Sequence, residues 1–211
     1  MKRTILDIGS NVGNHSIYFS KYFKSVQSFD PNPKLWKQFE ENVKINNSAN
    51  ITLHKLGLGD TSAELPFFDI ASDNQGLGTV VRAEQYDRPL RQIATVKVEH
   101  GDALMQLHGI RDIDAIKIDV QGFEPEVLAG LRSTLLRDKP VVWMEIGAGT
   151  SMKLERLDVL ESLFPYPIRL LRFETTRQFS GYRTSLVPAT GSVLPVGDYV
   201  VVPEDSRPAS R

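Results

Sequence analysis

Apolar and polar positions along the chain follow two periodicities that alternate. Short continuous apolar runs, typical of buried strands, occupy residues 4–8, 26–29, 51–58, 113–118 and 141–147. Between them, apolar residues recur every three or four positions, which predicts helices at 14–24, 34–46 and 153–164, and one after Glu124. Alternating strands and helices favour an α/β fold with helices on both faces of a mostly parallel sheet.

Residues 63–98 interrupt this alternation. They show no helical periodicity, and polar loops, including residues 73–78, separate three short predicted strands at 64–68, 77–81 and 95–99. We expect a small β-hairpin flap, because long insertions of this kind tend to be functional when they cover a crevice.

The C-terminal part predicts a different strand arrangement. Residues 169–173 and 199–202 are expected to close the sheet as an antiparallel hairpin, and residues 206–211 to form a flexible tail, leaving one domain at 1–205. The hairpin strands are separated by a long polar loop. That loop is either solvated or able to read a substrate phosphate or sugar, through Glu174, Arg177, Tyr182 and Arg183.

The first strand runs directly into a glycine-bearing turn. Gly9 and Gly13 permit a tight turn and a close approach to a ligand, and Asp7 at the strand end can accept hydrogen bonds from an ammonium or hydroxyl group. The amides at the start of the following helix face the same crevice. The predicted cofactor-binding residues of this turn are Asp7, Gly9, Ser10, Asn11, Gly13 and Asn14.

A second feature lies about 20 positions further on, where the next strand ends in Asp30 and Pro31. An acidic residue there holds a ribose hydroxyl pair in Rossmann-like folds. The glycine spacing is Gly-x-x-x-Gly, however, and lacks the glycine that packs against a dinucleotide pyrophosphate. This spacing favours a ligand with a ribose and no diphosphate, and S-adenosylmethionine (SAM) is the commonest such cofactor.

Two further aspartates are candidates for an adenine contact. Asp60 follows the third strand and is either an acceptor for the exocyclic amine or a plain turn residue. Asp102, the predicted N-cap of a short helix, is the second choice. His15 lies beside the glycine turn as a polar neighbour or, alternatively, a catalyst. We expect no metal role for the other three histidines, whose spacing does not suit metal ligation.

The second centre of chemistry follows residues 113–118. Asp119 stands at the carboxyl end of this strand, where ligands bind in open α/β sheets, and Gly122 lets the backbone pass the ligand. Glu124 either faces the crevice or merely complements the start of a helix. Glu145, at the tip of the fifth strand, is expected to accept a hydrogen bond from the substrate.

Three motifs, in this order and spacing, resemble the signatures of the FkbM family of SAM-dependent methyltransferases: Asp7-x-Gly9-x-Asn11-x-Gly13-Asn14, Phe29-Asp30-Pro31-Asn32-Pro33 and Ile116-Lys-Ile-Asp119-Val-Gln-Gly122-Phe-Glu124. The resemblance covers residues 4–146. It implies a Rossmann-like seven-stranded sheet and O-methylation of a hydroxyl on a small molecule or sugar. The chain departs from the family at Gln121, usually Glu, and at Asp30, often Glu, and it lacks the helical sequence that usually precedes the first strand.

The sulfonium methyl group is already activated, so the protein must chiefly align the acceptor and remove its proton. Asp119 or Glu124 is the candidate base, and the spacing does not choose between them. Asp119 and Glu145 could instead share a hard cation, but no third ligand is evident, and we predict no metal site.

The amino-acid composition limits the class of protein but indicates no particular reaction. A chain of 211 residues with 41% apolar and 24% charged residues suits one globular domain, and a net charge of −1 gives no case for an obligatory nucleic-acid partner. No apolar run approaches the ~18 residues of a membrane span, no signal peptide is expected, and the absence of cysteine excludes thiolate chemistry. A cytoplasmic location is therefore the default.

Two other functions stay open. An NAD-linked oxidoreductase is disfavoured by the missing dinucleotide glycine and by the lack of a Tyr-x-x-x-Lys pair. A catalytically degenerate SAM-fold scaffold is kept open by Gln121, because an amide cannot take a proton at neutral pH. Met1 stands close ahead of the first strand, so the site is open on that side, or a homo-oligomer or partner covers it, or the start is truncated.

Overall fold

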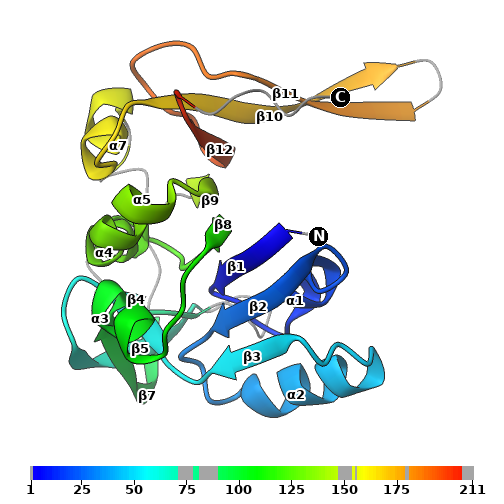
Figure 1. Ribbon diagram of the computed structural model, residues 1–211, viewed down its shortest axis with the longest axis vertical. Helices are drawn as coiled ribbons and strands as arrows, with labels where there is room; N and C mark the ends of the chain where they lie inside the picture. The colour runs from blue at the N-terminus through cyan, green and yellow to red at the C-terminus, as the bar shows by residue number, and fades with distance from the viewer. Residues whose placement is uncertain are drawn as a thin grey trace.

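The computed structural model describes residues 2–70, 78–80, 90–146, 154, 156–178 and 181–205 (Figure 1). Within these residues an eight-stranded sheet has the order β11-β10-β12-β9-β8-β1-β2-β3. Its strands are β1 (Lys2–Ile8), β2 (Phe23–Phe29), β3 (Ile51–His54), β8 (Ile113–Ile118), β9 (Val141–Ile146), β10 (Ile168–Gln178), β11 (Gly181–Pro188) and β12 (Gly197–Pro203). The predicted α/β class is confirmed, with one strand more than expected.

The centre of this sheet is parallel. Strand β1 pairs in parallel with β2 on one side and with β8 on the other, and β9 continues in parallel beside β8. The chain therefore builds outward from β1 to β3 and then crosses to the other side of β1, which creates a topological switch point at the carboxyl ends of β1 and β8. Strands β10 and β12 pair antiparallel, as predicted for the closing hairpin.

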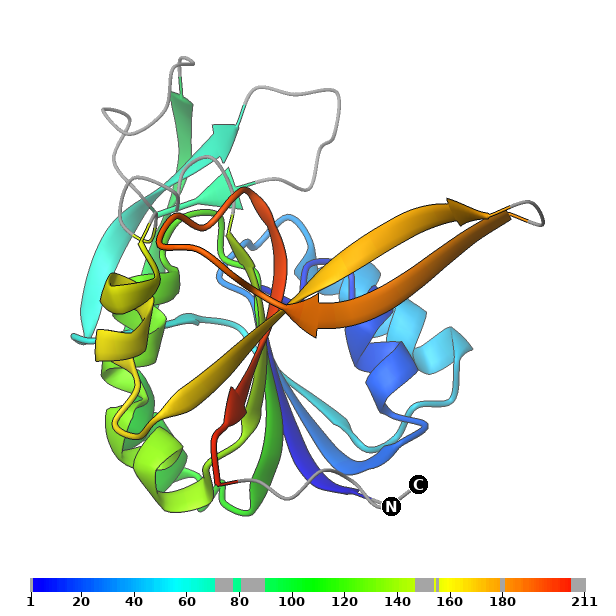
Figure 2. The ribbon, with the colours of Figure 1, turned by 90° about the horizontal axis from the view of Figure 1, so that it is seen from above.

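Helices cover both faces of the large sheet, as Figure 2 shows. Helices α3, α4, α5 and α7 lie on one face, and α1 and α2 on the other. Their bounds are α1 (Asn14–Phe19), α2 (Trp36–Ile45), α3 (Gly101–Leu107), α4 (Glu124–Gly130), α5 (Arg132–Asp138) and α7 (Leu157–Leu163). In the described part of the chain, no helix has the length and apolar character needed to cross a membrane.

The larger core lies under α4 and α5. The four apolar residues that the helical spacing directs inward, Val127, Leu128, Leu131 and Leu135, are all fully buried there. Full burial of such side chains stabilises by about 1.5–3 kcal/mol each. On the opposite face a smaller cluster joins α1 to the sheet through Ile5, Phe19, Phe23 and Val26.

Two predicted elements have different bounds. Helix α1 ends at Phe19 rather than near Lys24, because the amide of Asn50 donates to the carbonyls of Ser20 and Phe23 and holds a turn there. The strand predicted at 51–58 is split: β3 stays in the large sheet, and Gly57–Gly59 forms β4 of a second sheet.

The second sheet contains the insertion. Its order is β4-β7-β5-β6, with strands β5 (Ala63–Ile70), β6 (Gly78–Thr79) and β7 (Leu90–His100). The antiparallel pair of β5 and β7 agrees with the predicted hairpin. Most of the loop expected at 73–78, and the ends of the strand expected at 77–81, lie outside the described residues.

The prediction of a polar loop between the closing strands was wrong. The chain instead forms a β-hairpin, because β10 pairs with β12 only through Arg172 and continues to Gln178 paired with β11 alone. The arm contains Phe173, Tyr182 and three threonines, residue types that favour strands, which accounts for this extension. We call residues 173–178 and 181–186 the arm. Figure 2 shows the arm projecting from the sheet on the side of α1 and α2.

Candidate active site

A pocket opens where the carboxyl ends of β1, β2 and β8 meet the second sheet. Its walls combine apolar side chains with a few polar groups. Of the predicted site residues, the structure brings together Gly9, Asn11, Asp30, Pro31 and Asp119 around this pocket. The insertion contributes Phe67, Gly78, Thr79 and Val98 to the same lining, so it does border the crevice.

Asp30 is the most constrained polar group of the pocket. Its side chain is held by the backbone N–H groups of Asn11 at 2.7 Å and Asn32 at 2.8 Å, and the residue is only 6% exposed. Burial raises the pKa of Asp30 to about 6, although the two backbone hydrogen bonds oppose this. A carboxylate oriented in this way can accept hydrogen bonds from two neighbouring hydroxyl groups, which fits the predicted ribose contact.

The two turn glycines are required by packing within the chain. Gly9 has φ +79°, and an added Cβ would lie 1.8 Å from the backbone oxygen of Asp119. Gly13 has φ +87°, and its Cβ would lie 2.9 Å from the ring of Phe39. The sequence-based reason, close approach to a ligand, is therefore not the main one: Gly9 lets β1 and the end of β8 come together, and this contact shapes the pocket.

The other predicted residues of this turn lie behind the pocket or at its margin. Asp7 is fully buried, accepts a hydrogen bond of 2.5 Å from the Ser16 hydroxyl, and lies 3.8 Å from the Lys117 ammonium. Burial raises the pKa of Asp7, and the Lys117 charge opposes that effect. Ser10 is buried, and Asn14 is exposed at the start of α1. The hydroxyl and ammonium groups near Asp7 therefore come from Ser16 and Lys117 and not from a ligand, and Asp7 is not among the residues that line the pocket.

A connected polar group surrounds Asp119. Its carboxylate accepts hydrogen bonds from Lys117 Nζ at 3.3 Å and from Gln121 Nε2 at 2.9 Å, and its side chain remains 33% exposed. Gln121 Nε2 also lies 3.5 Å from Glu145 Oε2. One amide therefore bridges the carboxylates at the tips of β8 and β9, and Asp119 is also one of the residues that line the pocket.

Sequence reasoning missed the roles of Lys117 and Gln121. Lys117 is buried between Asp7 and Asp119, and the signal for it was a charged residue inside an otherwise apolar strand. Gln121 has φ +55°, a conformation that is uncommon for a residue with a side chain. Its carbonyl accepts a hydrogen bond from Thr79, which ties this loop to the second sheet.

Glu124 occupies a different position from the one that a base requires. It is 1% exposed, and its carboxylate accepts hydrogen bonds from the backbone N–H groups of Val120 and Gly122. Glu124 therefore braces the loop between β8 and α4 and is not part of the pocket lining. This arrangement favours the bracing interpretation and leaves Asp119 as the carboxylate with an exposed side.

Glu145 and His15 are not among the residues that line the pocket. Burial raises the pKa of Glu145, and the charge of Asp119 adds to this effect. The ring of His15 packs edge-on against Trp143, with centroids 5.2 Å apart, and burial lowers the pKa of His15.

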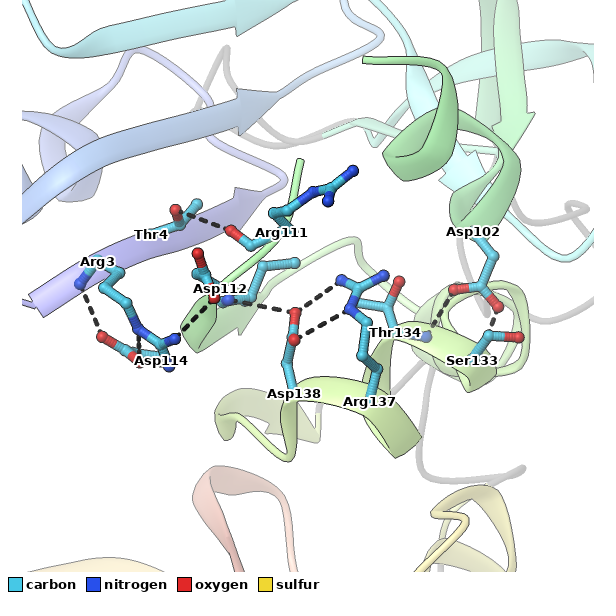
Figure 3. Close-up of polar contacts among 11 residues, drawn as sticks. Arg3, Thr4, Asp102, Arg111, Asp112, Asp114, Ser133, Thr134, Arg137 and Asp138 are labelled. Carbon is cyan, nitrogen blue, oxygen red and sulfur yellow. Dashed lines mark hydrogen bonds and ion pairs between the residues drawn. The ribbon is translucent and has the colours of Figure 1, made fainter. Parts of the chain in front are cut away.

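The two aspartates predicted for adenine do not join the pocket lining. Asp60 is exposed after β4 and accepts a hydrogen bond from Thr61. Asp102 does not cap its own helix, whose N-cap is His100; it accepts from the backbone N–H groups of Ser133 and Thr134 at the start of α5 (Figure 3). Burial raises the pKa of Asp102, but these hydrogen bonds outweigh it and lower the pKa overall.

Figure 3 also shows a charged network at the amino ends of β1 and β8. Arg3 bonds Asp112 and Asp114, and Asp138 accepts from Arg137 and from the backbone of Ile113. This network ties α5 to the sheet at the edge opposite the pocket, so we assign it a structural role.

Comparison with characterised proteins places these features in context. The chain is 26% identical over 143 residues to Methyltransferase 1 of Beauveria bassiana, and 29% identical over 147 residues to hexuronic acid methyltransferase AglP of Haloferax volcanii. These matches cover 60% and 70% of this chain. The chain spans 57% of the length of each of these two relatives.

Two solved structures share the fold. Methyltransferase FkbM from Methylobacillus flagellatus KT matches with a TM-score of 0.56 and 15% identity, over 95% of this chain and 43% of that one. SMU.1697c from Streptococcus mutans, in complex with SAH (S-adenosylhomocysteine), matches with a TM-score of 0.52 and 12% identity, over 95% and 88%. The family model described as Methyltransferase FkbM domain matches residues 7–173. This match extends over most of the chain, which therefore belongs to the FkbM methyltransferase family.

Proposed function

We propose that this protein is a SAM-dependent methyltransferase that methylates a hydroxyl group on a small molecule or sugar. The observation that carries the proposal is the presence of Asp30 and Asp119 on one pocket at the switch point of the sheet. The first carboxylate suits a ribose, and the second stands where an acceptor would approach.

The lining residues fit the cofactor. Asp30 would hold the ribose hydroxyls, and the apolar side chains of Phe29, Leu58, Val98 and Phe123 would enclose the adenine. When bound, the cofactor supplies an electrophilic methyl group that needs no further activation. A nucleotide-binding pocket without the glycine that accommodates a diphosphate supports SAM over NAD.

Asp119 is the residue best placed to act on the acceptor. Its carboxylate, which is one-third exposed, would accept the proton of the acceptor hydroxyl as the hydroxyl oxygen becomes a nucleophile, a contribution of about 10²–10⁴-fold. Lys117 and Gln121 donate to the carboxylate and fix its orientation. Alignment of the acceptor contributes the larger share, which reaches ~7–11 kcal/mol in well-oriented systems.

A sugar acceptor is supported by one relative. The Haloferax volcanii relative is named a hexuronic acid methyltransferase, and 70% of this chain matches it. We therefore place sugars first among the acceptors to be tested.

The experiment is a calorimetric titration of the purified protein with SAM, SAH and NAD in parallel, followed by methyl-transfer assays with hydroxylated acceptors. We expect micromolar binding of the two sulfur compounds and none of NAD. A protein that binds SAH but transfers no methyl group to any acceptor would instead fit the scaffold function. Binding of NAD alone would contradict the proposal.

A further inference from the structure

The arm leaves the large sheet as a ribbon of two strands. Beyond Arg172, β10 pairs with β11 alone, and β11 is the last strand of the sheet, so within the described residues no third strand lies along the arm. Figure 2 shows the arm projecting from the body of the protein. A two-stranded hairpin is only marginally stable in water, and a third strand with an apolar face is what makes such a ribbon stable.

The outer edge of β11 is available for a further strand. Thr184 lies opposite Thr175, and the hydroxyl oxygens of the two residues are 3.0 Å apart. Side chains come closest in those pairs of an antiparallel ladder that share no backbone hydrogen bonds. The N–H and C=O groups of Thr184, and by alternation those of Tyr182 and Leu186, therefore point away from β10. Such a row of backbone donors and acceptors is a template for another strand.

The same part of the arm exposes apolar side chains on one face. Tyr182 is 78% exposed, Leu186 is 46% exposed, and Phe173, which lies opposite Leu186, is 41% exposed. Thr184 shares this face with them, because every second residue of a strand points to the same side. The ring of Phe173 lies 6.1 Å from that of Trp143, so this face continues from the apolar hollow that Trp143 helps to line between β9 and α1.

A second copy of β11 complements this edge. Antiparallel pairing about a twofold axis at Thr184 places Tyr182 opposite the partner's Leu186, and Leu186 opposite the partner's Tyr182. The two Thr184 residues then face each other on the axis. Each apolar pair lies beside Phe173 of one copy, so an apolar row crosses the interface, and cross-strand pairs of this kind stabilise a sheet.

The opposite face of the arm favours the same register. There Arg183 lies opposite the partner's Ser185, and Ser185 lies opposite Glu174 within its own copy. Opposite charges therefore share a row and are separated by one small side chain. An axis at Arg183 would instead bring two guanidinium groups together. An axis at Ser185 would oppose Tyr182 to Pro188, which has no N–H to donate.

We propose that this protein forms a twofold-symmetric dimer in which the β11 strands of two copies pair antiparallel about Thr184. The pairing converts each arm into half of a four-stranded ribbon and covers the exposed edge of both copies. A second copy is the occupant because the edge complements itself on both faces. The interface is small, so we expect the dimer to dissociate at about micromolar concentrations.

The first test is sedimentation velocity of the protein over about a hundredfold range of concentration around the micromolar level. We expect a monomer–dimer equilibrium in which the average mass rises toward twice the monomer mass. A monomer at every concentration would overturn the inference. This measurement needs neither cofactor nor acceptor, so it is independent of the proposed function.

Cross-linking tests the position of the axis, because the chain contains no cysteine. Thr184→Cys should give a disulfide-linked dimer under mild oxidation, since Cα atoms of residues directly opposite each other are about 5.5 Å apart, within the range of a disulfide. Thr175→Cys is the matched control: it lies on the same face of the arm, but three strand spacings, about 14 Å, separate the two copies of this residue. Equal cross-linking of the two variants, or none of Thr184→Cys, would overturn the proposed pairing.

Charge substitutions test the register. Tyr182→Glu combined with Leu186→Glu places carboxylates opposite each other across the interface and should weaken the dimer at least about tenfold relative to Tyr182→Glu combined with Leu186→Lys. The second variant is the control, because it also removes both apolar side chains but sets opposite charges against each other. Thermal unfolding of both variants checks that the fold is retained. Equal dimer affinity in the two variants would contradict the register.

Discussion

The two sides of Asp119 are built differently. Toward β1 and β2, the pocket is shaped by backbone: two N–H groups hold Asp30, and Gly9 lets two strand ends touch. Toward β9 and the arm, the surface consists of side chains such as Trp143 and Phe173 on an open sheet face. A pocket shaped by backbone groups suits a single constant ligand. A surface of side chains can instead change by substitution to bind different acceptors without disturbing the fold.

The largest effect on stability is expected from a substitution in the part of the pocket that is shaped by backbone groups. Gly9→Ala places a methyl group on the backbone oxygen of Asp119 and should lower the free energy of unfolding by more than about 3 kcal/mol. Gly191→Ala is the control: it also has a positive φ, +102°, but no atom lies within 4 Å of its Cβ. We expect a loss of about 1–2 kcal/mol there, measured by denaturant unfolding. Equal losses would show that strain, and not the contact between strands, makes Gly9 necessary.

A comparison of Asp119→Asn with Glu124→Gln separates catalysis from support. Asp119→Asn keeps the shape and should lower kcat by about 10²–10⁴-fold with little change in Tm or SAH affinity. Glu124→Gln replaces an acceptor of backbone N–H groups and should cost about 1–3 kcal/mol in stability. A Glu124 variant of normal stability that lacks activity would reverse the two assignments.

The sequence predicted the backbone-built side well and the other side poorly. Asp30 and Asp119 were found because the strand-end positions are dictated by the α/β topology, which the apolar runs reveal. Lys117 and Gln121 were missed because each links Asp119 to a second carboxylate, Asp7 or Glu145, that is distant in sequence. The arm was missed because its threonines and arginines also suit a solvated loop, and only the pairing of residues 173–178 with β11 makes them a strand.

Asp102 is a further case in which a contact with a residue distant in sequence could not be predicted. A carboxylate at the start of a short helix predicts a cap of that helix, and nothing local reveals that it caps α5 instead. The predicted site residues differ in a similar way: Asp30 and Asp119, at strand ends of the switch point, line the pocket, whereas Asp60, in a turn, does not.

Asp30 gives the pocket side a pH dependence. Its folded pKa of about 6 exceeds its ordinary value of 3.8, so the folded protein binds a proton first as the pH falls. Asp30 therefore favours folding more below pH 4 than above pH 6, and this contribution is lost as the pH rises between them. Ribose binding uses the ionised form, so SAH affinity should fall by up to about tenfold per pH unit between pH 6 and pH 4.

Calorimetric titrations across this pH range measure the effect. Asp30→Asn is the matched variant, because it keeps the shape and removes the titrating group. It should bind SAH more weakly at pH 7.5 and lose this part of the pH dependence. An unchanged pH profile in Asp30→Asn would assign the titration to another group.

The smallest effect on SAH affinity and stability is expected at Asp60, which tests where the pocket ends. Asp60→Asn changes an exposed residue outside the lining, so SAH affinity and stability should change by less than about 0.5 kcal/mol. The same titration measures it. A tenfold loss of affinity would return Asp60 to the adenine site that its position after the third strand suggested.

The most direct measurement is a crystal structure of the protein with SAH. We expect the ribose hydroxyls on Asp30, the adenine among Phe29, Leu58 and Phe123, and the sulfur directed toward Asp119. Asp119 would then separate the cofactor from the open face beside Trp143. SAH bound in the hollow beside Trp143, or bound without contact to Asp30, would contradict the assignment of the pocket as the cofactor site.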